Sequence, residues 1–129
     1  MLWGKAYLTA YWLKHFAMDK IKFYQQSIKG IYQDIVKAYK GATNPLDVHL
    51  IFDEENHHYQ LLMLGWQGDD YIFQCLVHID IKQEKIWIQW IDTEYVITED
   101  LLKKGIPATA IVLGLKHPDY RQYTDFAVA

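Results

Sequence analysis

Residues 71–91 alternate between apolar and other side chains, and this period of two is typical of β-strands with two unlike faces. The polar stretch at residues 82–85 divides the run into two strands, which predicts a hairpin with Gln83 and Glu84 as its loop. One face of the hairpin is apolar and comprises Phe73, Cys75, Val77, Ile79, Ile81, Ile86 and Ile88. With a two-residue loop, the opposed pairs are Ile81 with Ile86, Ile79 with Ile88, Val77 with Trp90, and His78 with Gln89.

Residues 19–40 follow a different period, with an apolar side chain at every third or fourth position. This spacing predicts a helix of about six turns with a single apolar stripe. The stripe comprises Ile21, Tyr24, Ile28, Ile31, Ile35 and Tyr39. Asp19 is a suitable N-cap, and Gly41 suits the position just after the last turn.

The remaining elements are shorter. Residues 48–53 and 59–67 read as strands, and Gly68-Asp69 is the expected tight turn into the hairpin. Asp92, Thr93 and Glu94 are interpreted as the cap of a helix that stops near Gly105. A short strand is expected at residues 111–115, and a last short helix is expected to start at Pro118.

These elements predict an α+β fold. Its sheet is an antiparallel meander of four or more strands, with the long N-terminal helix on one face and short helices near the C-terminus. The length of 129 residues suits one domain. Met18 is a plausible start, so we expect residues 1–17 to be an N-terminal extension upstream of the natural start and residues 18–129 to form the domain.

A single long helix covers only one face of the sheet. The other face is predicted to hold the apolar residues Leu61, Met63, Ile72, Leu76 and Trp87, interleaved with His78, Asp80 and Gln89. Leaving such a surface in water is unfavourable and favours association. We therefore expect either the C-terminal segment or a second chain to cover it, and predict a homo-oligomer, most simply a dimer.

Composition points to protein partners. Thirteen Lys and Arg against 16 Asp and Glu give a net charge of −3, which argues against direct DNA binding. Ten Tyr and five Trp favour a protein-binding surface. The lone Cys75 at an inward strand position favours a reducing, cytoplasmic location. Lys5 and Lys14 interrupt the apolar start, which resembles neither a signal peptide nor a membrane span.

His78 and Asp80 are the strongest candidates for chemistry, because residues two apart on a strand point the same way. The turn containing Asp53, Glu54, His57 and His58 is expected to lie near them. A metal-dependent hydrolase would use such a mixture. The favoured interpretation is that His78 and Asp80 hydrogen-bond across the sheet and the turn is solvated, because no HExxH motif, paired CxxC motif or phosphate-binding glycine loop occurs. The sequence thus predicts no catalytic set, metal or cofactor.

Several segments resemble one family. The runs FDEENHHYQLLMLGW at 52–66 and CLVHIDIKQEKIWIQ at 75–89, the pair Thr93-Glu94, and the ending from Gly105 are similar to the XisI-like proteins, controlling factors for excision of the fdxN element. The resemblance runs from about Met18 to the C-terminus.

The chain departs from the family pattern at two places. Gln83-Glu84 stands where the family often has Asp-Gly, and the segment 91–94 reads Ile-Asp-Thr-Glu where the family often has Asp-Gly-Thr-Glu. The resemblance implies an accessory protein of programmed DNA excision that acts beside a site-specific recombinase and an XisH-like companion protein. Because the sequence also lacks a complete catalytic set, the leading hypothesis is a non-enzymatic regulatory protein that binds other proteins. Alternatives are a metal-dependent, nuclease-like enzyme using His78 and Asp80, and a direct DNA-binding factor.

Overall fold

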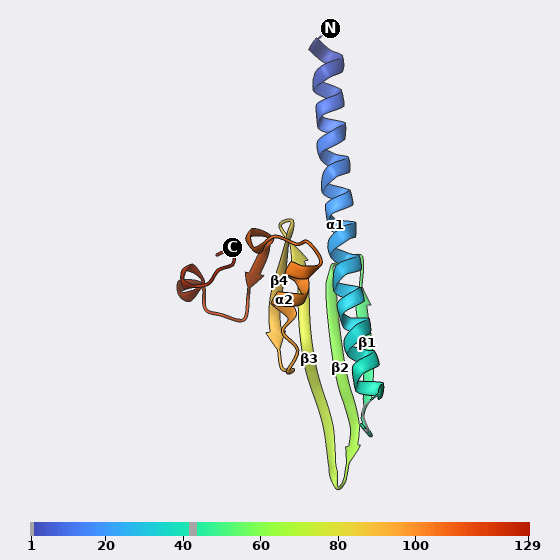
Figure 1. Cartoon of the computed structure of the whole chain (residues 1–129). Helices are drawn as coiled ribbons and strands as arrows, with labels where there is room; N and C mark the ends of the chain where they lie inside the picture. Colours follow the sequence, from blue (N-terminus) through green and yellow to red (C-terminus); the bar gives the residue numbers. More distant parts are fainter. Residues whose placement is uncertain (1, 42–43) are drawn as a thin grey trace.

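Five strands form one sheet that carries a long helix on one face (Figure 1). The computed structural model describes residues 2–41 and 44–129, with side chains from Asp19 onward in these ranges. In chain order the elements are α1 Leu2–Gly41, β1 Asp47–Asp53, β2 His58–Gln67, β3 Asp70–Lys82, β4 Lys85–Ile91, α2 Ile97–Lys103, the 3₁₀ turn η1 Ala108–Ala110, β5 Ile111–Leu113 and the 3₁₀ helix η2 Pro118–Tyr123.

The sheet has the strand order β1-β2-β3-β4-β5. The first four strands form an antiparallel meander, and β5 pairs in parallel with β4. A parallel neighbour needs a crossover connection, which α2 and η1 provide here. The predicted α+β meander with a long N-terminal helix and short C-terminal helices is confirmed.

Helix α1 is longer than the sequence pattern predicted. It begins at Leu2 and runs without a break past Asp19, so the predicted N-cap at Asp19 is wrong. The predicted apolar stripe is confirmed: Tyr24, Ile28, Ile31 and Ile35 are buried against the sheet. Among the described residues, no helix combines the length and the apolarity needed to cross a membrane.

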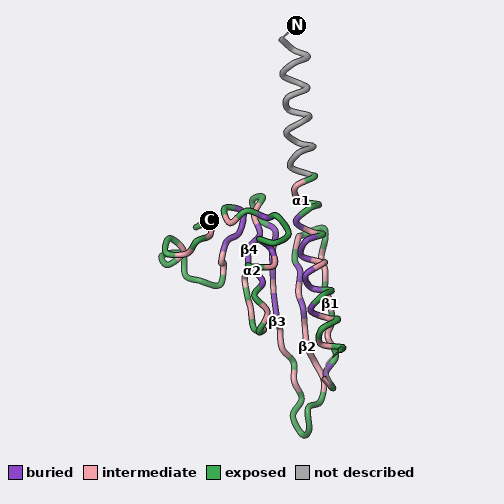
Figure 2. Tube along the Cα trace, in the orientation of Figure 1, coloured by how far each residue is buried: buried purple, intermediate pink, exposed green. Residues whose placement is uncertain are grey.

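The core lies between the sheet and a layer made of α1 and α2. Ile97 and Leu101 of α2 join the α1 stripe, and both are fully buried. Figure 2 shows buried residues concentrated where α1 and α2 meet the strands, whereas the tip of the β2–β3 hairpin is exposed. In the described part of the chain, no α-helix packs on the face of the sheet opposite α1, which we call the back face.

Both tight turns have two-residue loops, as predicted. Gln67 pairs with Asp70 around Gly68-Asp69, and Lys82 pairs with Lys85 around Gln83-Glu84. Gln83 and Glu84 have φ angles of 54° and 59°, the left-handed region that such a turn requires and that Asn and Gly adopt more easily.

Two β-bulges change the register of β3 with its neighbours, one with β2 and one with β4. At the first, Leu62 pairs with Cys75 but Leu61 pairs with Val77, so Leu76 is the extra residue. At the second, His78 pairs with Trp90 but Ile79 pairs with Ile88, so Gln89 is the extra residue. The predicted pairs Ile79–Ile88 and Ile81–Ile86 are confirmed.

The predicted pairs Val77–Trp90 and His78–Gln89 are wrong, because the second bulge shifts both. Val77 pairs instead with Ile91. Each bulge adds one residue to one strand, and one residue is enough to reverse the faces of everything beyond it.

The C-terminal elements follow the prediction except at the start of α2. Gly105, with a φ of 96°, follows the end of α2, and Pro118 opens η2. The N-cap position of α2 is Val96, without a side-chain cap, so the predicted capping by residues 92–94 is wrong. The Asp92 carboxylate accepts a hydrogen bond from Gln74 at 2.8 Å, and the Thr93 hydroxyl lies 3.1 Å from that of Tyr39.

Candidate functional site

A polar network centred on Asp80 occupies the middle of the back face. The Asp80 Oδ1 atom accepts hydrogen bonds from His58 Nδ1 at 2.6 Å and from His78 Nε2 at 2.7 Å. Gln60 Nε2 lies 2.9 Å from His78 Nδ1, and Gln89 Nε2 donates to Asp80 Oδ2 at 3.3 Å. We call these five residues the Asp80 network; they come from three adjacent strands, β2, β3 and β4.

Strand register explains why these side chains meet. His58 pairs with Asp80 and Gln60 with His78, directly across β2 and β3. Their neighbours Tyr59 and Ile79 are fully buried in the core, so alternation directs the network to the back face. Gln89 reaches Asp80 from the second bulge, which places it beside the carboxylate.

The network is partly shielded from water, and this affects its charges. The side chains of Asp80, His78 and His58 are 17%, 23% and 52% exposed. Partial burial raises the pKa of the Asp80 carboxyl, but the hydrogen bonds from His58 and His78 outweigh this effect and hold its pKa below the ordinary value. The hydrogen bond to Asp80 raises the pKa of His58 against a small opposing effect of burial. The pair therefore favours an ionised carboxylate beside a protonated imidazole.

The sequence prediction placed part of this network correctly. His78, Asp80 and Gln89 come together on the back face, and the favoured hydrogen bond between His78 and Asp80 is present. His58 lies beside them, as expected for the acidic turn, whereas Gln60 was not predicted to face them, although alternate polar residues at 58/60 and 78/80 carry that signal. Only a known register turns this signal into a contact.

Four of the five apolar residues assigned to the same face lie elsewhere. Ile72 pairs with Gly65 and alternates with Tyr71 and Phe73, so it lies on the α1 side of the sheet. Leu61 and Leu76 are buried in the core, and Met63 is half-buried against it. The first bulge is the reason: with Leu76 as an extra residue, Leu61 aligns with Val77 and faces α1. The same shift leaves Phe73, which was predicted to lie under the helix, 69% exposed, and Cys75, expected inside, only half-buried.

Trp87 does lie on the back face, and the C-terminal segment covers it. Its indole NH donates to the Lys82 carbonyl oxygen at 3.1 Å, and the Lys82 ammonium lies 4.1 Å from the ring centroid. The Arg121 guanidinium lies 5.3 Å from the same ring and donates to carbonyl oxygens of Leu113 and Gly114. Of the two predicted covers, the chain's own C-terminus is the one observed at Trp87.

The acidic turn between β1 and β2 contributes only His58 to the network. The Asp53 carboxylate accepts hydrogen bonds from the backbone and side chain of Asn56, which lower its pKa. Glu54 forms an ion pair with Lys29 of α1, and His57 lies 3.3 Å from Gln25. The carboxylates proposed for a hydrolase are therefore engaged away from Asp80.

A second feature of the back face lies at the free end of the β2–β3 hairpin, which extends past the end of α1 (Figure 1). Trp66 and Tyr71 form a cross-strand pair in edge-to-face contact, with centroids 5.2 Å apart. Phe73 lies two positions along β3 from Tyr71 and faces the same way. These three residues, the hairpin aromatic cluster, are 64%, 55% and 69% exposed.

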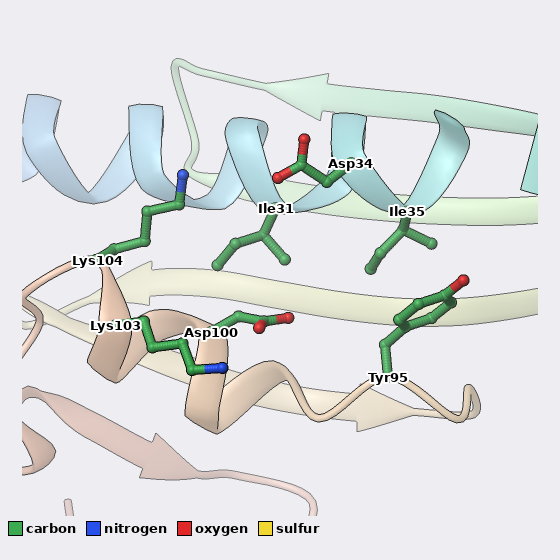
Figure 3. Close-up of a pocket in the computed structure, with 7 residues that line it drawn as sticks. All are labelled: Ile31, Asp34, Ile35, Tyr95, Asp100, Lys103 and Lys104. Atoms are coloured by element: carbon green, nitrogen blue, oxygen red, sulfur yellow. The ribbon is translucent and has the colours of Figure 1, made fainter. Parts of the chain in front are cut away.

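An open groove of about 250 Å³ separates α1 from α2 on the other face (Figure 3). Its lining residues are Ile31, Asp34, Ile35, Tyr95, Asp100, Lys103 and Lys104. The two carboxylates and two ammonium groups give the groove no excess of either charge. It therefore has no electrostatic preference for one class of ligand.

Comparisons with known proteins agree with this architecture. A family model described as XisI protein matches residues 18–128. The crystal structure of the fdxN element excision controlling factor XisI from Anabaena variabilis has 32% sequence identity and a TM-score of 0.71, covering 85% of this chain and 99% of that one.

A second crystal structure, of a XisI-like protein from Anabaena variabilis, has 39% identity and a TM-score of 0.77. That match covers 84% of this chain and 99% of the other. No curated protein is significantly similar in sequence.

Proposed function

The chain belongs to the XisI family, and from this premise we propose that it regulates excision of a DNA element by binding another protein, without catalysing a reaction. A relative of known structure is named as an excision controlling factor, which supports a regulatory role in excision. The protein-binding mode and the lack of catalysis are our own extension of that role.

The hairpin aromatic cluster carries this proposal. Trp, Tyr and Phe are enriched in protein interfaces, because each buries a large area at a small cost in side-chain entropy. Here three of them stand together on a projecting hairpin, each more than half exposed. No described segment of the chain packs over them as the C-terminus packs over Trp87.

The partner we propose is an XisH-like companion protein, the one that family membership suggests. The predicted homodimer is a separate proposal, for which the same cluster is the available surface. Because the C-terminal segment already covers Trp87, this residue no longer favours a homodimer. The exposed hairpin aromatic cluster still does. Mass measurement of the purified chain distinguishes a dimer from a monomer.

Co-expression with the companion protein tests the proposal. We expect the two chains to co-purify, and Trp66→Thr and Phe73→Thr to reduce recovery of the companion sharply. Threonine keeps the strand propensity of these positions, and both are so exposed that folding should not change. Tyr123→Thr is the matched control, an aromatic residue 79% exposed on η2.

Equal recovery with all variants would place the contact elsewhere. Failure of the wild-type chain to bind the companion would contradict the proposed partner.

The Asp80 network is the part of the molecule on which the alternative, a metal-dependent enzyme, would depend. Two imidazoles and a carboxylate are the ligand types of a metal-dependent hydrolase, but Asp53 and Glu54 are engaged elsewhere. We therefore expect the purified chain to leave DNA intact in the presence of divalent metal ions. DNA cleavage that disappears in Asp80→Asn would establish the alternative.

A further inference from the structure

We propose that His58, His78 and Asp80 form a binding site for a divalent transition-metal ion such as Zn²⁺. These residues are the group in the described part of the chain whose ligand atoms all lie within 4.8 Å of one another. Two imidazole nitrogens and one carboxylate oxygen suit Zn²⁺ and the neighbouring first-row metals. The isolated chain supplies all three ligands, so the site does not depend on a partner protein.

The three proposed ligand atoms already lie close to one another. His58 Nδ1 and His78 Nε2 both face the same oxygen of Asp80, at 2.6 Å and 2.7 Å. A tetrahedral ion with bonds of about 2.0–2.1 Å holds its ligand atoms about 3.3 Å apart. The site must therefore widen by roughly 0.6 Å along each contact, which small side-chain rotations supply because His58 is half exposed.

The surroundings provide the support that metal ligands usually have. A ligating histidine generally bonds through its second ring nitrogen to a polar group that fixes the ring. Gln60 lies 2.9 Å from the second nitrogen of His78. Gln89 donates to the second oxygen of Asp80 and orients the carboxylate.

Metal binding leaves no buried donor without a partner. Both imidazoles now donate a proton to Asp80, and a metal ion takes the place of these protons. The proton of His78 then moves to Nδ1, where the side-chain amide of Gln60, turned over, accepts it. His58 releases its Nδ1 proton to solvent and keeps the proton on Nε2, which has access to water because the side chain is 52% exposed.

Three protein ligands leave at least one coordination position for water. The exposed side of His58 is where that position opens, so the ion would be bound at the surface of the sheet and would link β2 to β3. Binding of this kind stabilises the folded chain, because the unfolded chain does not hold the three ligands together.

Titration of the full-length, metal-free chain with Zn²⁺ tests the site by calorimetry and thermal unfolding. We expect one ion per chain, a dissociation constant in the micromolar range or lower, and a higher Tm. His58→Ala should weaken binding at least about tenfold; its exposure makes it safe for folding. His49→Ala is the control, an exposed histidine on the same face that lies outside the cluster.

Replacement of His78 by Gln provides a second variant, and the Tm in chelator verifies that each variant is folded. Absence of binding by the wild-type chain would overturn the proposal. So would binding that survives His58→Ala and His78→Gln, or binding that His49→Ala weakens equally, because each result means that the ion sits on scattered surface groups. Loss confined to the two cluster variants supports the site.

Discussion

Replacing Asp80 with asparagine tests how much the Asp80 network contributes to the fold. The substitution keeps the shape of the side chain but removes its charge and one acceptor oxygen. His58, His78 and Gln89 all donate to this carboxylate. At least one of these donors then faces an amide NH₂ group in place of an oxygen.

The expected loss follows from burial. A hydrogen bond to a charged group contributes about 1.5–3 kcal/mol when it is well shielded, which applies best to His78 and Asp80, at 23% and 17% exposure. The bond from His58 contributes less, under about 1 kcal/mol, because that imidazole is half exposed. We expect Asp80→Asn to lower the free energy of unfolding by about 2 kcal/mol. For 129 residues this corresponds to a fall in Tm of about 7 °C.

The effect should depend on pH in a defined way. The folded chain lowers the pKa of Asp80, so its contribution is present above the unfolded value of about 3.9 and disappears as the pH falls through the folded value. The folded chain raises the pKa of His58, so that contribution is complete below about 6.5 and disappears as the pH rises through the folded value. The wild-type advantage should therefore be largest between about pH 4 and pH 6.5.

Thermal unfolding of the wild-type chain and the Asp80→Asn variant in chelator, from acid to mildly alkaline pH, measures this difference in stability. Asp125→Asn is the control, since that carboxylate is exposed and has no hydrogen bond or ion pair within the described residues. A difference below about 0.5 kcal/mol at every pH, or one that grows steadily with pH, would refute the reasoning.

Three further changes have expected outcomes. Tyr32→Phe removes the hydroxyl that donates to the Tyr59 carbonyl oxygen at 2.8 Å, and should lower the free energy of unfolding in urea by about 1 kcal/mol. The buried hydroxyl of Tyr24 has no partner among the described residues, so Tyr24→Phe should lower it by less than about 0.5 kcal/mol. Equal losses for the two variants would contradict this. Glu84→Gly relieves a φ of 59° and should raise the free energy of unfolding by about 1 kcal/mol, measured from the shift of the urea midpoint. A lower free energy of unfolding would contradict this. Removing residues 1–17 should leave Tm within about 2 °C, because the core contacts described above lie within residues 18–128, and a loss of several degrees would contradict the predicted domain start.

Periodicity predicted most of the fold. The apolar stripe of the long helix, the strand positions and both two-residue turns follow from the period of the side chains and the turn residues. Even the Gln83-Glu84 turn forms as predicted, because the pairing of Ile81 with Ile86 and of Ile79 with Ile88 outweighs an unfavourable loop sequence.

The back face could not be predicted in the same way, because a bulge has no clear signature in this sequence. A single extra residue at Leu76 moves Leu61 into the core and turns Phe73 out to solvent. The same shift aligns His58 with Asp80. Residues assigned by strict alternation were therefore correct on the Gln83-Glu84 side of the first bulge, including His78 and Asp80, and wrong on its Gly68-Asp69 side.

The affinity of the XisH-like companion for this chain tests the proposed mode of regulation most directly. We expect calorimetry to give one binding event, and Phe73→Thr to weaken it by about 30-fold, the effect of losing a central aromatic contact of about 2 kcal/mol. Tyr123→Thr should leave the affinity unchanged. Absence of binding, or equal affinity for the wild-type chain and the Phe73→Thr variant, would contradict regulation through the hairpin.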